Sequence, residues 1–485
     1  MKSDKELYRQ LRTLSCDKLW NEEVPRFDRA DSRERLQRVA VIRAVGVAFA
    51  GSGSAERRAE VRAWLARLLK DPAEKIRRYA MAAIPKIGAG RREESELLSL
   101  LKTGPGEREK KYLGRALDKI GGPATLEAAA GGLLPQTELK VKAGVERRER
   151  PSAVRLDRVL SKFDGLRIHL RCRRGLEEIV RDEFVERVGS HGKFRGDEVR
   201  GGLVAISPVK PFSLADLYAL RCFGTVNFVL GGVRGRPSDE STDALARLIA
   251  SPLSRLLMTT FTEGSLRYRL DFISRSHQRG AIRDLANRAY ALSPDILNDA
   301  RLAPWSIDIR EDGRGVLIEL RPRFAPDPRF DYRKDDVDAA SHPPLAACMA
   351  RLAGRRKDEI VWDPFCGSGQ ELVERALLGG VTRVVGTDIS REAIAIAQTN
   401  FAAAKVKRVQ AKFACCDFRD FARVGELGPN SVTLIITNPP MGRRIRIPDM
   451  RGFFSDFFAV AAAALRPGGH LVFGNPLRLA PRDPS

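Results

Sequence analysis

The last third of the sequence alternates regularly between short apolar runs and amphipathic stretches, and this alternation constrains the possible folds more than any other feature. Five runs read as strands and three longer stretches read as helices. The strands are expected at 359–362, 381–386, 411–415, 431–437 and 470–474, and the helices at 370–378, 391–403 and 453–465. Strands that alternate with helices pair in parallel, so the pattern predicts an α/β doubly wound sheet.

Glycines and acidic residues follow the first two of these strands. In an open parallel sheet a ligand lies beyond the carboxyl ends of the strands. The first strand leads into Asp363-Pro364-Phe365-Cys366-Gly367-Ser368-Gly369, a Gly-x-Gly turn that lets a ligand approach the backbone and offers it free N–H groups. The second strand is followed by Asp388, whose carboxylate can accept both hydroxyls of a ribose or, alternatively, cap the next helix.

The third and fourth strands also end in groups that suit a ligand. Asp417 and Phe418 follow the third strand, and they offer a polar and an apolar group for the edge and the face of an adenine. Asn438-Pro439-Pro440-Met441 follows the fourth strand, and its two prolines fix the backbone and leave carbonyl groups without competing N–H donors. The side-chain oxygen of Asn438 and the carbonyl of Pro439 can accept both hydrogens of an exocyclic amine, which directs its lone pair towards an electrophile.

The first 125 residues contain an internal repeat. Residues 77–88 match residues 110–121 at a constant offset of 33, and each copy follows another amphipathic stretch and ends at a glycine. Helix pairs that repeat at this period stack into a solenoid, and the pattern resembles HEAT-like repeats. We expect residues 1–125 to dock a protein or a nucleic acid and to carry no chemistry. A basic outward face would favour RNA, and a plain solvated face is the alternative.

The middle of the chain has a different composition. Residues 126–164 change from a Gly- and Ala-rich stretch to a charged run, which predicts a linker. Strands and helices are mixed over residues 165–325, which predicts an α+β domain. A proline-punctuated segment, 321–344, then leads into the α/β domain, for which we expect the bounds 326–485.

The charge balance is strongly basic. Lys and Arg number 85, Asp and Glu number 62, and the net charge is +23 over 485 residues. Such an excess fits a partner with a phosphate backbone, although an Arg-rich genome would produce the same composition. The excess is spread along the chain and is largest in residues 1–150, which hold 33 basic and 22 acidic residues. We therefore expect a polyanionic partner without assigning it to one patch.

Cysteine, histidine and apolar residues limit the other partners. The seven cysteines are scattered, which favours a reducing, cytoplasmic location. No apolar run reaches the ~18 residues that a membrane span requires, so no membrane partner is expected. The five histidines are far apart and form no cluster with the spacing of metal ligands, so no metal is expected.

The motifs of the last third, taken together, resemble those of Rossmann-type S-adenosylmethionine-dependent amino-methyltransferases. The shared motifs are Asp363–Gly369, Asp388-Ile389 and Asn438-Pro439-Pro440. More narrowly, the chain resembles the RNA guanine-N2 methyltransferases that carry a THUMP domain, because Arg174-Gly175-Leu176-Glu177 looks like the opening of that domain. The resemblance covers about residues 165–480. It implies a THUMP-like RNA-binding domain at 165–325 and a methyltransferase domain at 326–485.

The resemblance implies a role for each motif, with S-adenosylmethionine as cofactor and structured RNA, either tRNA or rRNA, as substrate. Asp363 and the glycine turn would hold the methionine moiety, Asp388 the ribose, and Asp417 with Phe418 the adenine. The implied cofactor-binding residues are Asp363, Pro364, Phe365, Gly367, Ser368, Gly369, Asp388, Ile389, Asp417 and Phe418. The target guanine amine would be held by Asn438, Pro439, Pro440 and Met441, and RNA phosphates by Arg333, Arg443, Arg444 and Arg446.

Two departures from the family keep other functions open. The residue after the two prolines is usually aromatic in the family, where it stacks on the base, but here it is Met441. The chain also ends about eleven residues after the fifth strand, so the methyltransferase domain looks shortened at its C-terminus. The alternatives are adenine-N6 methylation by the same geometry, and an RNA-binding or assembly scaffold with a vestigial methyltransferase domain.

Overall fold

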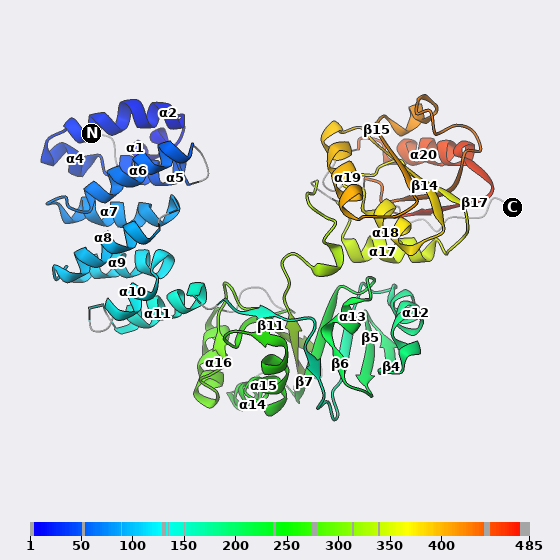
Figure 1. Cartoon of the computed structure of the whole chain (residues 1–485), viewed down its shortest axis with the longest axis horizontal. Coiled ribbons are helices and arrows are strands. Elements are labelled where there is room, and N and C mark those ends of the chain that lie inside the picture. Colours follow the sequence, from blue (N-terminus) through cyan, green and yellow to red (C-terminus); the bar gives the residue numbers. More distant parts are fainter. Residues whose placement is uncertain are drawn as a thin grey trace. The chain divides into compact units, whose positions relative to one another are not determined.

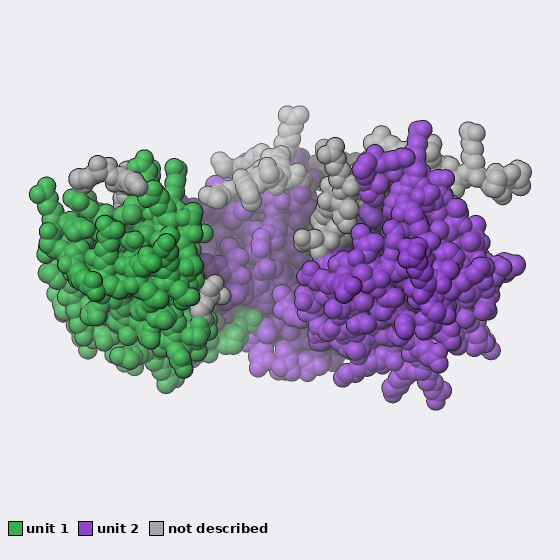
Figure 2. Space-filling view, turned by 90° about the horizontal axis from the view of Figure 1, so that it is seen from above, with its two compact units in different colours: residues 1–152 green, residues 153–485 purple. Residues whose placement is uncertain are grey.

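The computed structural model divides the chain into two compact units, residues 1–152 and 153–485 (Figures 1 and 2), and each is described by itself. The structure describes residues 4–50, 54–88, 90–128, 132–133, 135–149, 151–235, 239–273, 279–312, 315–337, 340–440 and 447–475. Within these ranges, every helix is too short or too polar to span a lipid bilayer.

The first unit is a stack of helices in two layers, drawn in blue to cyan in Figure 1. One layer consists of α1 (Asp4–Leu11), α5 (Ala40–Ala48), α7 (Glu74–Ala83), α9 (Glu107–Ile120) and α11 (Pro135–Glu149), each in contact with the next. The other layer includes α6 (Ala55–Leu68), α8 (Arg91–Lys102) and α10 (Pro123–Ala128), each in contact with the helix that follows it. Short helical segments join α1 to α5: α2 (Cys16–Lys18), a π-helix (Leu19–Glu23), α3 (Val24–Arg29) and α4 (Ser32–Gln37).

The internal repeat corresponds to the second helix of two successive pairs. Residues 77–88 lie on α7 and on the 3-10 turn Ile84–Lys86 after it, and residues 110–121 lie on α9. Buried apolar side chains fill the space between the layers, including Trp64, Leu65, Met81, Leu113 and Leu117. The helical character of this region is confirmed, and its assignment to HEAT-like repeats stays a prediction.

The segment expected to be a linker, 126–164, differs from the prediction. Its first residues end α10, and residues 135–149 form α11, which packs on α9. Val141 and Val145 lie four residues apart on one face of α11 and are both buried in the core of the first unit. The neighbouring charged residues obscured this apolar face in the sequence, so the helical region is longer than we expected.

The first part of the second unit is built on an eight-stranded mixed sheet. Its strand order is β10-β9-β11-β12-β7-β3-β5-β4. The strands are β3 (Ile168–Arg171), β4 (Phe194–Arg200), β5 (Leu203–Pro208), β7 (Thr225–Arg234), β9 (Arg267–Phe272), β10 (Leu297–Asn298), β11 (Trp305–Asp312) and β12 (Gly315–Pro322). Strands β10 and β11 pair in parallel with β9, and the other neighbours are antiparallel.

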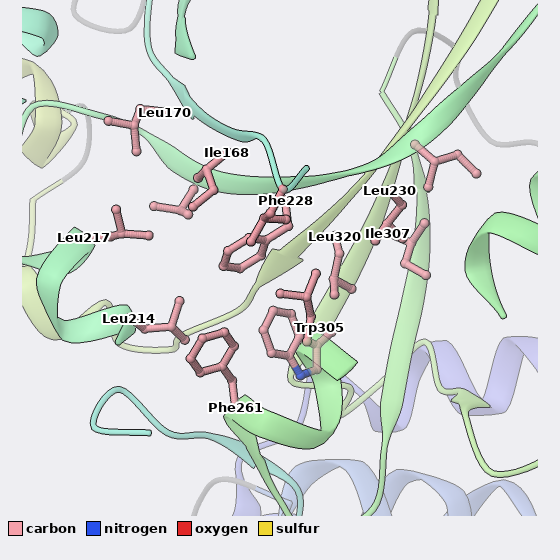
Figure 3. Packing of buried hydrophobic residues seen from close by; sticks show 14 of the residues in the cluster. Ile168, Leu170, Leu214, Leu217, Phe228, Leu230, Phe261, Trp305, Ile307 and Leu320 are labelled. Carbon is pink, nitrogen blue, oxygen red and sulfur yellow. The ribbon is translucent and has the colours of Figure 1, made fainter. Parts of the chain in front are cut away.

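Helices and one continuous apolar core accompany this sheet. The helices are α12 (Glu177–Arg187), α13 (Leu214–Tyr218), α14 (Asp239–Ile249), α15 (Pro252–Phe261) and α16 (Arg279–Leu292). Two short antiparallel pairs lie beside the sheet: β1 (Ala153–Val154) with β8 (Thr262–Glu263), and β2 (Val159–Leu160) with β6 (Phe212–Ser213). Figure 3 shows part of the core, where Ile168, Phe228, Trp305 and Leu320 of four strands lie near Phe261 of α15. The expected mixture of strands and helices is present, and its identity as a THUMP domain stays a prediction.

The second part of this unit is a five-stranded sheet in which all neighbours are parallel. The strand order is β15-β14-β13-β16-β17. The strands are β13 (Glu359–Asp363), β14 (Val381–Asp388), β15 (Gln410–Cys415), β16 (Val432–Thr437) and β17 (Leu465–Phe473). The α/β Rossmann-like fold is therefore confirmed, and most elements begin and end within a few residues of their predicted bounds.

Helices cover both faces of the parallel sheet because alternate strand residues face two separate cores. Val361 and Val384 face one core, and Trp362 and Val385 face the other. The first core contains side chains of α17 (Pro343–Leu352), α18 (Gln370–Leu378) and α19 (Arg391–Ala403). The second contains side chains of α20 (Met450–Ala464) and of the 3-10 segment η5 (Phe418–Arg423). Burial on both faces explains why these strands read as continuous apolar runs.

The segment between the two parts of the second unit is anchored to both. Arg329 donates a hydrogen bond to the backbone carbonyl of Phe223 at 2.8 Å. Arg221 donates two hydrogen bonds to the carboxylate of Glu374 on α18, at 2.7 and 2.8 Å, and the hydroxyl of Tyr332 donates to the same group at 2.8 Å. The segment expected to be a proline-punctuated linker is therefore a fixed connection, and it ends in α17, a helix that we did not predict.

Candidate active site

The four strand ends singled out in the sequence lie at one edge of the parallel sheet. Asp363 ends β13, Asp388 ends β14, Asp417 follows β15 by two residues, and Asn438 directly follows β16. Strands β13 and β16 are neighbours, and the helices that follow them, α18 and α20, lie on opposite faces. Ligands of open α/β sheets bind at such a switch point, so this edge is the candidate active site.

Asp363 is fully buried at the end of β13. Its Oδ1 accepts hydrogen bonds from the backbone N–H of Phe365 (3.0 Å) and from the hydroxyl of Thr437 (2.6 Å). Its Oδ2 has no hydrogen-bond partner among the residues that the structure describes. Burial, followed by the negative charge of Glu371, raises the pKa of this carboxyl well above its ordinary value. A cationic group of a ligand would supply the missing partner and stabilise the buried charge.

The turn after β13 requires glycine at two positions. Gly367 and Gly369 have φ angles of +48° and +80°, in the left-handed region that favours glycine. A side chain at Gly369 would also begin only 3.2 Å from the Cβ of Ala397 on α19. The N–H of Gly367 donates to Oδ2 of Asp388 at 3.0 Å. The turn therefore joins the ends of β13 and β14, the two places where an elongated ligand would be held.

Asp388 is not the cap of the helix that follows it. The N-cap of α19 is Ser390, whose hydroxyl accepts the N–H of Ala393 at 3.2 Å. Asp388 accepts one backbone N–H on each oxygen, from Gly367 and, at 2.9 Å, from Ser390. Each carboxylate oxygen can accept a further hydrogen bond. The side chain of Ile389 is 76% exposed beside it, so the site offers a polar acceptor next to an apolar surface.

Asp417 and Phe418 take part in contacts within the protein. The carboxylate of Asp417 caps η5 by accepting the N–H of Arg419 at 2.9 Å, and it forms an ion pair with the same arginine. The ring of Phe418 is only 2% exposed and packs against the rings of Phe365 and Phe453, with centroids 5.0 and 5.4 Å away. These three aromatic rings pack together beneath this end of the sheet. A direct contact between Phe418 and an adenine stays a prediction.

Asn438 is held by hydrogen bonds that leave its carbonyl oxygen unused. Its Nδ2 donates to the hydroxyl of Ser341 at 2.9 Å, and this hydroxyl donates in turn to the carboxylate of Glu371. Its Oδ1 is buried and has no hydrogen-bond partner among the described residues. The next residue, Pro439, is buried as well. Because an unpaired buried acceptor is costly, the site is arranged to receive a donor from a ligand.

Several residues of the site were not found in the sequence. Glu371 follows the glycine turn in the first turn of α18 and is only 4% exposed, and burial raises the pKa of its carboxyl. A buried acid in this place could have been suspected from its position beside the turn. Ser341 precedes α17 and meets Asn438 only through the fold. Asn400 of α19 is fully buried and donates to the carbonyls of Ser368 and Asp335, both at 3.0 Å.

Four of the eight residues predicted to contact the substrate lie outside the described part of the chain. These are Met441, Arg443, Arg444 and Arg446. Arg333 is described, and it forms an ion pair with Asp336. The RNA contacts predicted for these arginines stay predictions. The described residues contain no cluster of three or more possible metal ligands.

A basic cavity lies next to the segment that carries Ser341. It has a volume of about 570 Å³, and its lining includes Arg173, Arg174 and His342. Arg173 and Arg174 are exposed and have no ion-pair partner among the residues that the structure describes, whereas Arg171 in the same lining is paired with Glu319. Burial, and then nearby arginines, lower the pKa of His342, so its ring stays neutral at neutral pH. The cavity therefore offers, close to the candidate site, two positive charges that have no ion-pair partner in the described ranges.

The methyltransferase motifs lie in a region with known relatives. Residues 331–476 match the family described as RMKL-like, methyltransferase domain. The tRNA (guanine(10)-N2)-dimethyltransferase of Methanocaldococcus jannaschii is 31% identical over 171 residues, which are 34% of this chain and 46% of that protein. The protein of the same name from Methanothermobacter thermautotrophicus is 30% identical over 139 residues, which are 28% of this chain and 38% of that protein. A solved structure, TrmN from Thermus thermophilus, gives a TM-score of 0.48 and 21% identity over 64% of this chain and 88% of that one.

The matched region contains the whole candidate site. Asp363, Asp388 and Asn438 all lie within residues 331–476. The chain spans less than half the length of the two curated relatives. The family match and the relatives support methyltransferase activity for the part of the chain that holds the candidate site, and S-adenosylmethionine as its cofactor.

Proposed function

We propose that this protein transfers a methyl group from S-adenosylmethionine to the exocyclic N2 amine of a guanine in tRNA. One observation carries the proposal. The buried Oδ1 of Asn438 has no partner among the described residues, and it lies at the switch point of a sheet whose neighbouring strand ends in a cofactor-type glycine turn. Such an acceptor fits a planar amine, whose two hydrogens need two oxygens in fixed positions.

The residues present at the edge of the sheet fit S-adenosylmethionine. The unpaired Oδ2 of Asp363 would accept the ammonium group of its methionine moiety, and the left-handed turn at Gly367 and Gly369 leaves room for a ligand against the backbone. Asp388 would accept the ribose hydroxyls, with Ile389 as the exposed apolar neighbour. When bound, the cofactor supplies a methyl group on a positively charged sulfur, so the protein needs only to align the acceptor.

Alignment of the target amine is the task of Asn438. Its Oδ1 and the carbonyl of Pro439 would accept the two amine hydrogens and turn the nitrogen lone pair out of conjugation with the base. Ser341 and Glu371 fix the amide from the other side, because Nδ2 already donates to the serine hydroxyl. Rotation of the amide would break its hydrogen bond to Ser341, whose hydroxyl is itself held by Glu371, so the acceptor oxygen stays in place.

Three observations support RNA as the substrate. The two curated relatives are named as tRNA guanine-N2 enzymes. The net charge of +23 fits a polyanion. The basic cavity with Arg173 and Arg174 lies next to the segment that carries Ser341, which contacts the site, so a phosphate could be held near a flipped base.

The first test is isothermal titration of the full chain with S-adenosylmethionine. We expect binding in the wild type and loss of binding in Asp388→Ala, because the ribose would lose its acceptor. Glu392→Ala on the first turn of α19 is a matched control, since this acidic side chain is exposed and lies outside the site. The absence of binding to the folded wild type would overturn the proposal and leave an RNA-binding scaffold as the better account.

The second test identifies the product. Unmodified tRNA incubated with the protein and the cofactor is digested to nucleosides and analysed by mass spectrometry. Detection of N2-methylguanosine supports the proposal. Detection of N6-methyladenosine would show that the target base is adenine and not guanine. Transfer to rRNA and not to tRNA would correct the class of RNA.

A further inference from the structure

Three helices in one layer of the first unit, α5, α7 and α9, together carry more basic than acidic residues. These three helices contain nine Lys or Arg and four Asp or Glu. Helices α6 and α8 of the other layer contain seven Lys or Arg and five Asp or Glu. One of the four acids, Glu109, is buried and paired with Arg77. Acidic residues therefore offset a smaller share of the positive charge on α5, α7 and α9 than on α6 and α8.

Four of these basic residues form a row on α9, which we call the α9 face: Arg108, Lys111, Arg115 and Lys119. All four side chains are exposed, and none has an ion-pair partner among the residues that the structure describes. Their spacing of three or four residues places them on one side of the helix. The row extends over about 16 Å at 1.5 Å per residue. It offers several positive charges along a line, as a phosphate backbone requires.

Aromatic rings lie between the basic groups of this layer. The ring of Tyr112 on α9 lies between Arg78 of α7 and Arg115, whose guanidinium carbons are 5.4 and 5.6 Å from its centroid. Farther along the layer, Arg43 of α5 lies 4.1 Å from the ring centroid of Tyr8 on α1. Arginine and tyrosine in alternation can contact both the phosphates and the bases of a nucleic acid.

The described residues of the same unit offer little exposed apolar surface to a protein partner. Among its described residues, no large hydrophobic side chain is exposed. Interfaces between proteins have a core that is more apolar than the rest of the surface and becomes buried on binding. A polyanion needs no such core, because contacts to its phosphates supply the affinity.

We propose that the α9 face binds the phosphate backbone of RNA. The first unit then adds an RNA contact to a chain whose chemistry lies in the second unit. The inference rests on the proposed function only in the choice of tRNA as the RNA, and its test measures binding without methyl transfer.

The test compares two sets of charge reversals in the full chain. One variant carries Arg108→Glu, Lys111→Glu, Arg115→Glu and Lys119→Glu. The matched control carries Arg58→Glu, Arg91→Glu, Arg92→Glu and Lys102→Glu on α6 and α8, where these side chains also have no ion-pair partner among the described residues. Both variants change the net charge by the same amount. A third variant with glutamine at the four α9 positions removes the charges without introducing repulsion.

The measurement is the dissociation constant of fluorescently labelled bulk tRNA at several salt concentrations. We expect the α9 reversal to weaken binding by at least about tenfold, and the glutamine variant to lower the slope of log Kd against log salt by about 0.7 to 0.9 for each lost contact. The control reversal should weaken binding less than about threefold. Circular dichroism confirms that each variant is folded.

Two results would overturn the inference. Equal weakening by the α9 set and the control set would mean that only the net charge matters. Unchanged tRNA binding in the glutamine variant would mean that the face serves another partner. Titration with S-adenosylmethionine is run in parallel and should give the same affinity in every variant, so failure of the cofactor site and failure of RNA binding are told apart.

Discussion

The edge of the parallel sheet and the α9 face use polar groups in opposite ways. At the edge, Asp363 and Asn438 are held by the fold, and each has one buried oxygen without a partner among the described residues. On the α9 face the groups are exposed, alike and repeated. When a buried polar group is removed, no neighbouring group can take over its contact. Exposed charges act together through many screened interactions, so the loss of one of them has a small effect. The contrast predicts that a single substitution at the edge of the sheet abolishes methyl transfer, whereas a single substitution on the α9 face only reduces RNA binding.

The largest effect is expected for Asn438→Ala. Loss of the acceptor oxygen should lower the rate of methyl transfer to tRNA by about 100-fold or more, the order seen when one positioned polar group is removed from an active site. The affinity for S-adenosylmethionine should stay within about twofold, because the proposed role of Asn438 is to contact the amine and not the cofactor. Transfer is followed with a labelled methyl group. Near-normal transfer by the variant would show that another group aligns the amine.

The next effect concerns a buried charge outside the site. Glu374→Gln leaves Arg221, whose side chain is only 20% exposed, without its ionic partner. The free energy of unfolding of the second unit should fall by about 3 kcal/mol. The matched control is Glu178→Gln, which removes one of the two exposed ion-pair partners of Arg181 and should cost less than about 1 kcal/mol. Urea unfolding measures both, and equal losses would contradict the distinction between buried and exposed charges.

The pH dependence of cofactor binding tests the role of Asp363. Burial and the charge of Glu371 raise the pKa of this carboxyl, so it takes up a proton at a higher pH than an ordinary aspartate. An ammonium group binds the ionised form, so affinity should rise with pH through this pKa and fall by about tenfold for each unit below it. Titrations from pH 5 to 8 measure the effect. Asp363→Asn should bind weakly at every pH, and a pH profile like that of the wild type would exclude Asp363 as the responsible group.

The smallest effect is expected for a single charge on the α9 face. Arg115→Ala should weaken tRNA binding by about two- to threefold at low salt, because one exposed contact contributes less than about 1 kcal/mol. The effect should disappear at about 0.5 M salt, where exposed charges are screened. The affinity for S-adenosylmethionine, which depends mainly on buried or half-buried groups, should change less over the same range. A tenfold or larger loss of tRNA affinity from this one substitution would contradict the contrast, because a single exposed charge would then matter as much as a buried group.

The sequence predicted the parallel sheet well because burial on both faces leaves a clear signal. It missed β7, in which Gly231 and Gly232 interrupt the apolar pattern and the pairing with β12 shifts register. It also missed β4, an edge strand with mostly exposed side chains. Helix α11 was hidden because its two buried valines precede a charged run.

The candidate site was only partly visible in the sequence. Asp363, Asp388 and Asn438 could be found because topology requires functional residues at the ends of parallel strands. The contact between Asn438 and Ser341 joins residues 97 positions apart, so no local pattern predicts it. The alternative of Asp388 as a helix cap could be decided only when the structure showed that Ser390 is the cap.

Asn400 has a consequence for the shape of the cofactor site. Its Oδ1 accepts the N–H of Lys334 at 2.8 Å, while its Nδ2 holds the carbonyls of Asp335 and Ser368. One buried amide thereby ties the connecting segment to the glycine turn, the place where the cofactor would be held. We expect a change at Asn400 to loosen the turn and the connecting segment together, although Asn400 itself lies on neither.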